Sequence, residues 1–325
     1  VDGWFVPSMP DLNQRNPHVI KYLIQNSIWW IETAGINGIR MDTYPYADRK
    51  AMALWMKTLN EEYPNFNVVG ETWNTEPAFT AAWQKDSKLS DINSNLKSVM
   101  DFSFFEKINK AKNEETDAWW DGLNRIYNSL VYDYLYEKPE NVMAFIENHD
   151  TDRFLGNGQD VATLKQALAL LLTMNRTPQL YYGTEVLMNG TKEVTDGHVR
   201  QNFPGGFPGD AHTAFTAEGR SKAQNDVFNW LSKLLHWRQG NEVITQGKQI
   251  QFIPHQGVYV LARRHQGKTV LTVLNGTSKE TRLDVKRYAE IIGNKTAGHD
   301  VISGENVDMS KDIKLAPRQT LVIEL

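Results

Sequence analysis

The feature that most constrains the fold is a repeated alternation of short apolar segments with longer segments of helical periodicity. Apolar segments of strand length occur at residues 36–41, 66–70, 98–102, 141–146 and 178–182. Helical patterns occur at residues 16–34, 49–62, 104–134, 161–174 and from 221 onward. Regular alternation of strand and helix predicts a parallel α/β sheet that is covered by helices.

From about residue 243 the pattern changes to an alternation with a period of two residues. Residues 258–264 and 268–274 alternate in this way, and Asn275-Gly276 follows as a tight-turn signal. The same style continues at residues 282–285 and 320–325. We therefore predict an α/β part over residues 1–242 and a small antiparallel β-sandwich over residues 243–325.

Three carboxylates stand directly after predicted buried strands: Asp42, Glu71 and Asp150. The carboxyl ends of parallel strands meet on one side of a sheet, and in parallel barrels reactive groups gather there. Paired carboxylates in such a position suit glycoside hydrolysis, which needs one nucleophile and one proton donor. A strand-end Asp near an Arg is on its own more often a structural ion pair, so the joint occurrence carries the inference.

Composition excludes several other classes of function. The net charge of −4 gives no reason to expect a nucleic acid or an anionic membrane as partner. The chain has no cysteine, which excludes disulfides and thiolate metal sites. No apolar run reaches the roughly 18–20 residues of a membrane span. The chain starts at Val1 without a methionine, and we expect its natural N-terminus to lie upstream.

Five motifs in order resemble those of the α-amylase family of glycoside hydrolases, from about residue 2 to the end. They are Met9-Pro10-Asp11-Leu12-Asn13, Gly38-Ile39-Arg40-Met41-Asp42, Gly70-Glu71-Thr72-Trp73, Glu147-Asn148-His149-Asp150, and the segment from Pro178 to Glu185. Each motif alone is weak, but five in order at plausible spacing are specific. Within the family, residues 200–207 resemble a loop of neopullulanase and cyclomaltodextrinase-like enzymes.

The resemblance implies a retaining reaction at α-glucosidic bonds. Asp42 would be the nucleophile, and Glu71 would be the general acid and base. Asp150 would bind the 2- and 3-hydroxyls of the sugar, and His149 would donate a hydrogen bond to the same ring. Arg40, two residues before Asp42, should point to the same side of the strand and keep that carboxylate ionised. Glu71 needs a raised pKa, for which the nearby charge of Asp42 is a plausible cause.

Aromatic residues near these motifs are candidates for sugar contacts. Tyr44 and Trp73 follow the strands that carry Asp42 and Glu71, and either could form a stacking platform or simply pack within a loop. Phe207 lies in a glycine-rich loop that could reach the substrate. The Trp119-Trp120 pair is expected in the core or in an interface.

The resemblance also implies a partial TIM (β/α)8 barrel, because the chain supplies only the last five of eight strands. We expect a C-terminal fragment of a longer enzyme, inactive as it stands, with its open sheet edge covered by self-association or a homodimer. No metal or other cofactor is expected in this fragment, whereas calcium could bind in the missing N-terminal part. The resemblance suggests a bacterial protein of the periplasm or the cytoplasm.

The expected substrates are α-glucans, namely maltooligosaccharides, cyclodextrins or pullulan. Two alternatives remain open at this point. A non-catalytic relative would bind glucan or act as a scaffold, but such proteins usually lose a catalytic carboxylate. A transglycosidase would use the same three carboxylates and pass the glycosyl group to a sugar instead of water.

Overall fold

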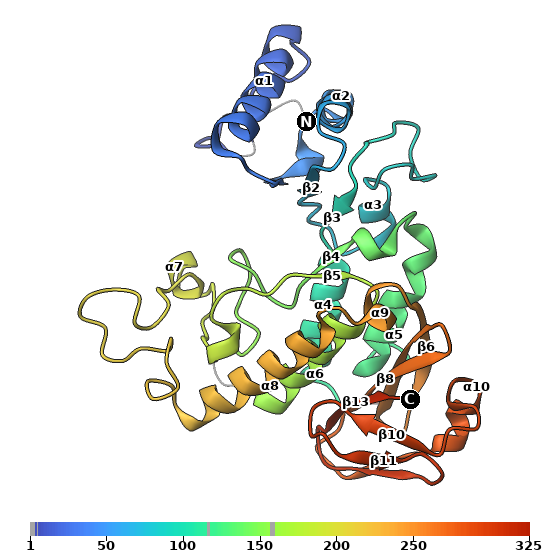
Figure 1. Ribbon diagram of the computed structural model, residues 1–325. Helices are drawn as coiled ribbons and strands as arrows, with labels where there is room; N and C mark the ends of the chain where they lie inside the picture. The colour runs from blue at the N-terminus through green and yellow to red at the C-terminus, as the bar shows by residue number, and fades with distance from the viewer. Residues whose placement is uncertain (1–3, 5, 116–117, 157–159) are drawn as a thin grey trace. The chain divides into compact units, whose positions relative to one another are not determined.

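The computed structural model describes residue 4 and residues 6–115, 118–156 and 160–325. The chain divides into two compact units, and Figure 1 follows it by colour from the N-terminus to the C-terminus. Unit 1 comprises Val1–Ser103 and Val131–Ala144. Unit 2 comprises Phe104–Leu130 and Phe145–Leu325.

Unit 1 is built on a three-stranded parallel sheet of order β1-β2-β3. Its strands are β1 (Gly38–Met41), β2 (Asn67–Gly70) and β3 (Ser98–Val99). An isolated parallel bridge joins Met100, just after β3, to Met143 in the short strand β4 (Met143–Ala144). The three strands thus run side by side in chain order, as helix-connected parallel strands do.

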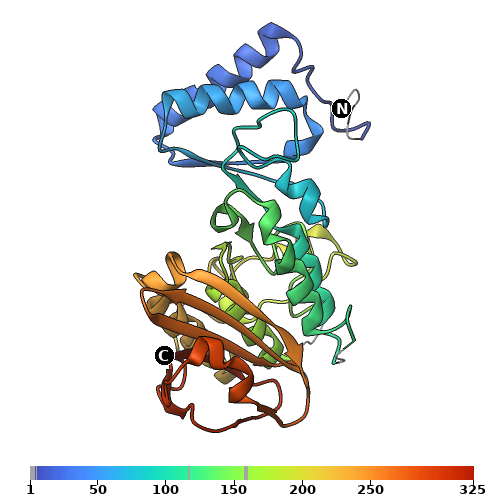
Figure 2. The ribbon, with the colours of Figure 1, turned by 90° about the vertical axis from the view of Figure 1, so that its right-hand side faces the viewer.

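Helix α1 (Pro17–Ala34) precedes β1, and helix α2 (Arg49–Glu62) connects β1 to β2. Asn16 caps α1 by accepting a hydrogen bond from the His18 amide, and Gly35 ends it in the left-handed region at φ 61°. Both helices contribute to one apolar core and pack against each other, as Figure 2 shows for the two blue helices. The short helix α3 (Pro77–Ala81) and the 3-10 turns η1 (Tyr44–Tyr46), η2 (Tyr132–Leu135) and η3 (Pro139–Asn141) complete the unit.

Unit 2 is organised around α6 (Val161–Thr173), which is buried along most of its length. Asp160 caps its start, and ten of its thirteen residues are buried, Thr163, Gln166 and Thr173 among them. A helix that is buried over most of its surface belongs in a core. The long helix α8 (Lys222–Arg238) packs against it and begins with a capping box between Ser221 and Gln224. The remaining helical segments and one short strand are α5 (Leu123–Val131), α7 (Asp196–Val199), α9 (Glu242–Thr245), η4 (Thr184–Val186) and β5 (Thr177–Pro178), while α4 (Phe102–Ala111) begins in unit 1.

The C-terminal residues of unit 2 form a six-stranded antiparallel sheet of order β11-β10-β13-β8-β7-β6 (Figure 2, orange to red). Its strands are β6 (Lys248–His255), β7 (Val258–His265), β8 (Lys268–Asn275), β10 (Ala297–Asp300), β11 (Asn306–Asp308) and β13 (Thr320–Glu324). A separate antiparallel pair, β9 (Thr281–Leu283) with β12 (Ile313–Leu315), shares one apolar core with the sheet. The short helical segments η5 (Val285–Tyr288) and α10 (Ala289–Ile292) also contribute to that core.

Buried polar contacts fix the antiparallel sheet to α6. Arg263 on β7 is 1% exposed and donates hydrogen bonds to the backbone oxygens of Gly247 (2.6 Å) and Thr173 (3.1 Å). Gln166 on α6 donates to the Asn275 carbonyl at 2.6 Å. Every one of these groups is buried and paired. A shift of the helix along the sheet would therefore leave buried polar atoms without hydrogen-bond partners, which costs free energy.

The α/β pattern with a C-terminal antiparallel sheet is confirmed, but several predicted boundaries are wrong. The predicted strand 98–102 ends at Val99, because Phe102 already begins α4. The predicted helical region 104–134 is interrupted, since α4 ends at Ala111 and α5 begins at Leu123. The parallel strands in the described part of the chain do not close into a barrel. The boundary at 242/243 stays a prediction. Within the same residues no helix is long and apolar enough to cross a membrane.

Candidate active site

Asp42 follows the last residue of β1 and is the most accessible of the predicted carboxylates in unit 1. Its side chain is 63% exposed, and Oδ1 accepts a hydrogen bond from Arg40 Nη1 at 2.5 Å. Asp42 stands two residues after Arg40, in the turn that follows the strand, and the two side chains meet there. The structure therefore confirms that Arg40 contacts Asp42.

Glu71 follows the last residue of β2 and is buried, with a side chain 4% exposed. Its Oε1 accepts from Arg40 Nη2 at 2.5 Å, and its Oε2 accepts from the Thr43 amide at 2.9 Å. The β1–β2 pairing continues past the strand ends, because the Glu71 amide donates to the Met41 carbonyl at 2.9 Å. That register places the residues that follow β1 beside the residues that follow β2.

Arg40 thus connects the two carboxylates that the sequence predicts to do the chemistry. A guanidinium has a planar array of donors that can serve two carboxylates at once. This second contact was not part of the expectation, which had Glu71 holding a proton. The Arg40 guanidinium therefore lies between the two carboxyl groups and donates to both.

A cavity of about 410 Å³ lies at Asp42. Its walls come from the N-terminal segment and from the residues after β1: Trp4, Met9, Pro10, Asp11, Gln14, Met41, Asp42, Thr43, Tyr46 and Ala47. The Met9–Asn13 motif therefore contributes directly to the surroundings of Asp42. Trp4 and Gln14 belong to the same wall and were not singled out from the sequence, because an exposed Trp or Gln in a loop carries no pattern.

Tyr44 is not a sugar platform. It is fully buried in the core of unit 1, and its ring lies edge-on to Trp83 with centroids 5.6 Å apart. Gly70 leaves room for it, since a Cβ there would stand 2.9 Å from Tyr44 Cγ. Burial raises the pKa of the Tyr44 hydroxyl. Both faces of the ring are therefore occupied by the protein interior.

Trp73 keeps the exposure that a stacking platform requires. It is 43% exposed, and its ring stacks on Phe102 at 4.9 Å with an interplanar angle of 15°. Thr72, the preceding residue, is buried and donates to the Met100 carbonyl at 3.2 Å. The indole is thus held on one side and accessible on the other, which leaves its predicted substrate role open.

Asp150 belongs to unit 2, where it joins His149 and Arg200. Its Oδ2 lies 3.0 Å from His149 Nε2, and its Oδ1 accepts from Arg200 Nη2 at 2.8 Å. Arg200 Nε also donates to the His149 carbonyl at 2.7 Å. Arg200, the first residue of the 200–207 loop segment, thus pairs with the predicted sugar-binding carboxylate.

A buried ion pair between Glu147 and Arg153 stabilises the segment that carries Asp150. Glu147 accepts hydrogen bonds from the Thr184 hydroxyl and the Phe154 amide, and Arg153 Nη1 lies 3.5 Å from it. Arg153 in turn donates to the carbonyls of Tyr182 (2.6 Å) and Val199 (3.0 Å). Burial raises the pKa of the Glu147 carboxyl, and its hydrogen bonds and Arg153 act in the opposite sense. The pair ties the residues on either side of Asp150 to the residue that precedes Arg200.

Phe207 lies in an exposed loop and is itself 58% exposed. The Asp210 carboxylate accepts from the amides of Gly205 (2.7 Å) and Phe207 (3.1 Å), which shapes the loop tip. A substrate role for Phe207 stays a prediction. Among the described residues, no group of three or more His, Asp or Glu side chains is placed to hold a metal ion.

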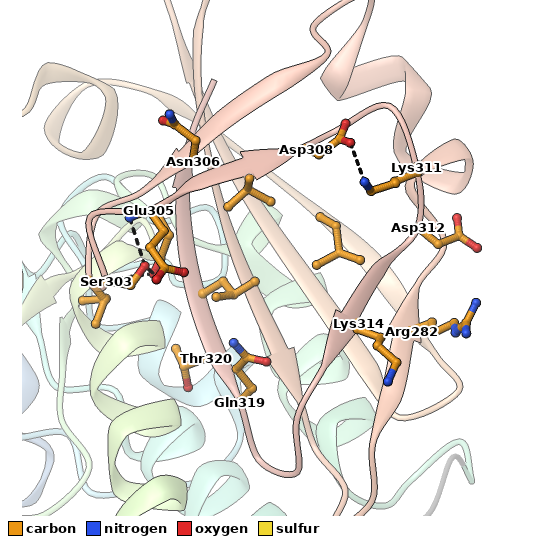
Figure 3. Close-up of a pocket in the computed structure, with 15 residues that line it drawn as sticks. Arg282, Ser303, Glu305, Asn306, Asp308, Lys311, Asp312, Lys314, Gln319 and Thr320 are labelled. Carbon is orange, nitrogen blue, oxygen red and sulfur yellow. Dashed lines mark hydrogen bonds and ion pairs between the residues drawn. The ribbon is translucent and has the colours of Figure 1, made fainter.

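A second cavity, of about 630 Å³, opens in the C-terminal sheet region and contains none of the predicted site residues (Figure 3). Apolar side chains of Ile302, Val307, Ile313 and Leu321 line it together with charged residues. Two of those charged residues, Asp308 and Lys311, pair with each other at 2.8 Å. None of the residues of the five motifs lines this cavity, so we do not assign it to the candidate active site.

Comparison with known proteins agrees with the motifs. Residues 3–247 match the α-amylase catalytic domain, and residues 249–324 match the cyclomaltodextrinase C-terminal domain. The chain is 26% identical to a cyclomaltodextrin glucanotransferase of Geobacillus stearothermophilus over 92% of its length. It is 28% identical to a cyclomaltodextrinase of Thermoanaerobacter pseudethanolicus over 84% of its length. The matches span only 39% and 43% of those two relatives.

Solved structures show the same fold. An Anoxybacillus α-amylase superposes with a TM-score of 0.78 at 23% identity, over 98% of this chain and 65% of that one. An α-amylase of Geobacillus thermoleovorans, complexed with acarbose, superposes with a TM-score of 0.79 at 22% identity, over 98% and 66%. The chain therefore belongs to the α-amylase family, with that family's catalytic domain followed by a C-terminal domain of the cyclomaltodextrinase type.

Proposed function

We propose that this chain carries the catalytic groups for retaining hydrolysis of α-glucosidic bonds in α-glucans. The observation that supports this most is the guanidinium of Arg40, which donates to both Asp42 and Glu71. Glycoside hydrolysis requires a pair of carboxyl groups on one site, and a retaining enzyme requires them close together. Asp42 is exposed and Glu71 is buried, which suits their proposed roles as nucleophile and general acid.

In the proposed reaction Asp42 attacks the anomeric carbon, and the bond to the leaving oxygen breaks as Glu71 gives that oxygen its proton. Water, deprotonated by Glu71, then cleaves the bond between the sugar and Asp42 and restores both groups. In this reaction Glu71 has to carry a proton when the substrate binds, and Arg40 holds Asp42 through its Nη1 contact.

The Asp150 cluster of unit 2 would bind the sugar. Asp150 can accept hydrogen bonds from the 2- and 3-hydroxyls, and His149 can donate to the same ring. Arg200 fixes the orientation of Asp150 through the 2.8 Å contact. Trp73 and Phe207 stay proposed stacking residues, on the strength of their exposure.

The proposed substrates are maltooligosaccharides, cyclodextrins or pullulan. The cyclomaltodextrinase name of one relative and the cyclomaltodextrinase-type C-terminal domain support this choice. Several relatives are cyclomaltodextrin glucanotransferases, and this observation favours transglycosylation as the second candidate. A non-catalytic scaffold is disfavoured because Asp42, Glu71 and Asp150 are all present.

We also propose that activity requires the β1 edge of the parallel sheet to be covered. In the described part of the chain β1 pairs with β2 alone, and Ile39 and Met41 on it are only partly buried. Edge strands with apolar side chains associate readily. A second copy of the chain could cover this edge, and light scattering across a concentration series would detect it.

The test is hydrolysis of pullulan, cyclodextrin and maltoheptaose by the protein, with Asp42→Asn as the variant. We expect hydrolysis that the substitution abolishes, while thermal unfolding is unchanged because Asp42 is exposed. Product analysis separates the two candidates, since glucan transfer gives longer or cyclic products and hydrolysis gives shorter ones. Hydrolysis that is indifferent to Asp42 would contradict the proposal.

A further inference from the structure

Two consecutive tryptophans form the tip of a tight turn in unit 2. The Asp121 amide donates to the Ala118 carbonyl at 3.1 Å, which closes a four-residue turn with Trp119 and Trp120 at its centre. Trp119 is 69% exposed and Trp120 is 72% exposed. The pair was expected in the core or in an interface; this exposure excludes the core, and a place in an interface stays a prediction. Turn centres normally carry Gly, Pro, Asn, Asp or Ser, so local propensity does not explain two indoles here.

The turn is anchored by a set of charged contacts at its base. Glu114 accepts from the Gly122 amide at 2.7 Å and from Arg125 Nε and Nη2, each at 2.6 Å. Gly122 adopts a positive φ of 53°, which a residue with a side chain would adopt only with strain. Asp121 contacts Arg125 as well, at 3.0 Å. Arg125, Glu114 and Asp121 thus fix the base of the turn.

Further contacts hold the turn from its other sides. The carbonyls of Ala118 and Trp119 accept from the side-chain amides of Asn124 (3.1 Å) and Asn128 (2.7 Å) on α5. Glu115 pairs with Arg318 at 2.6 Å and accepts from the Ser278 hydroxyl at 2.9 Å, which ties the segment to the C-terminal sheet region. The two indoles are therefore presented on a preorganised backbone.

Preorganised exposed aromatic rings cost little entropy when they bind a partner. An indole has a flat apolar face, and the apolar face of a pyranose fits it. Asp121 directly follows the pair and Glu115 lies four residues before Trp119, with side chains 39% and 41% exposed. Each of the two pairs with an arginine, and a carboxylate can accept further hydrogen bonds from hydroxyls. A neutral chain of sugar rings has both the flat apolar faces and the hydroxyls that this surface accommodates.

We propose that Trp119 and Trp120 form a glucan-contact surface that contains none of the predicted catalytic carboxylates Asp42, Glu71 and Asp150. The identity of the ligand as an α-glucan rests on the proposed function. The surface would bind a run of consecutive glucose units and hold polymeric substrate without taking part in bond cleavage.

The test is affinity electrophoresis of the full chain in gels that contain soluble starch. The comparison uses the Asp42→Asn background, so that no substrate is consumed. Trp119→Ala/Trp120→Ala should weaken starch binding by about tenfold or more, because both stacking rings are removed. Trp119→Tyr/Trp120→Tyr should retain most of the binding because it keeps two flat rings.

Trp29 and Trp30 on α1 supply the matched control. They are also consecutive and about half exposed, at 53% and 50%, but their rings meet at 77° on a helix surface. Trp29→Ala/Trp30→Ala should leave starch binding unchanged. Starch binding that survives Trp119→Ala/Trp120→Ala, or a chain that starch does not retard at all, would overturn the proposal. So would a change in oligomeric state in that variant without loss of starch binding, because the pair would then be a protein contact.

These outcomes are independent of the proposed catalytic function. Loss of hydrolysis in Asp42→Asn tests the catalytic site, whereas the tryptophan variants are read out by binding alone. Hydrolysis that depends on Asp42, together with starch binding that ignores Trp119 and Trp120, would refute only the surface.

Discussion

Arg40 and Glu71 lie 31 residues apart in the chain, yet Nη2 of the arginine stands 2.5 Å from Oε1 of the glutamate. The parallel pairing of β1 with β2 produces this contact, because it aligns Met41 with Gly70 and so brings the following residues together. Arg40 keeps its local partner Asp42 at the same time. The electrostatics of the candidate site are therefore decided by strand register.

Arg40→Lys should lower hydrolytic activity by about tenfold or more, because a single ammonium cannot reproduce a fork that serves two carboxylates. Arg40→Met should in addition lower the free energy of unfolding by roughly 3 kcal/mol, since it leaves the buried Glu71 without its cation. Steady-state kinetics and urea unfolding of both variants measure these effects. Full activity in Arg40→Lys would show that the second contact is incidental.

Tyr44→Phe should leave activity unchanged and should not destabilise the protein. The Tyr44 hydroxyl is buried and has no hydrogen-bond partner among the described residues, so removing it eliminates an unsatisfied group. Tyr44→Ala should cost about 3–5 kcal/mol of stability, as large-to-small changes at buried aromatics do. Thermal unfolding of both variants checks this. A loss of substrate affinity in a normally stable Tyr44→Phe protein would restore the sugar-contact reading.

Arg153→Met should destabilise the protein by about 3–5 kcal/mol, because the Arg153 side chain is fully buried and Glu147 would lose its cation. Arg200→Met is the matched control: this arginine is 40% exposed, and its loss should change stability by no more than about 0.5 kcal/mol. Denaturant unfolding distinguishes the two. Equal stability losses would mean that Arg153 does not support the Asp150 segment in the manner described.

Lys112 should make stability depend on pH in the alkaline range. Burial lowers the pKa of Lys112 from 10.5 to about 8, although Glu147 and Asp152 oppose the shift. Between pH 8 and 10.5 the unfolded chain therefore binds more protons than the folded one, so the free energy of unfolding rises with pH across this window. The gain should be roughly 1–2 kcal/mol once partial exposure of the ammonium is allowed for.

The measurement for Lys112 is urea unfolding at pH 8 and pH 10, with Lys112→Met as the comparison. The variant keeps the aliphatic stem but loses the hydrogen bonds to the Phe154 carbonyl (2.5 Å) and Asn109 (3.0 Å). It should lack the rise in stability. Identical pH dependence in both proteins would place the titration of Lys112 outside this window.

Local sequence signals predicted much of the architecture. Asn16 and Pro17 mark the start of α1, and Gly35 marks its end, because capping and backbone conformation depend on the few residues next to the terminus. Each of the five predicted parallel strands has a counterpart, but most are shorter than expected. A short apolar run predicts that its residues are buried more reliably than it predicts the length of the strand, because the chain can leave the sheet as soon as strand pairing ends.

The sequence by itself determined the strand-end positions of Asp42 and Glu71, and the place of Asp42, Glu71 and Asp150 in the family's motifs, because motif and strand are both local. The prediction that Asp150 directly follows a strand is wrong, since β4 ends at Ala144, six residues earlier. Only the tertiary structure decided that Arg40 serves two carboxylates, that Tyr44 is buried, and that Trp119 and Trp120 are exposed. These three outcomes depend on which segments, distant in the sequence, lie beside a given side chain in the fold. An aromatic residue favours burial and binding for the same physical reason, the removal of apolar surface from water, so its sequence position alone does not distinguish them.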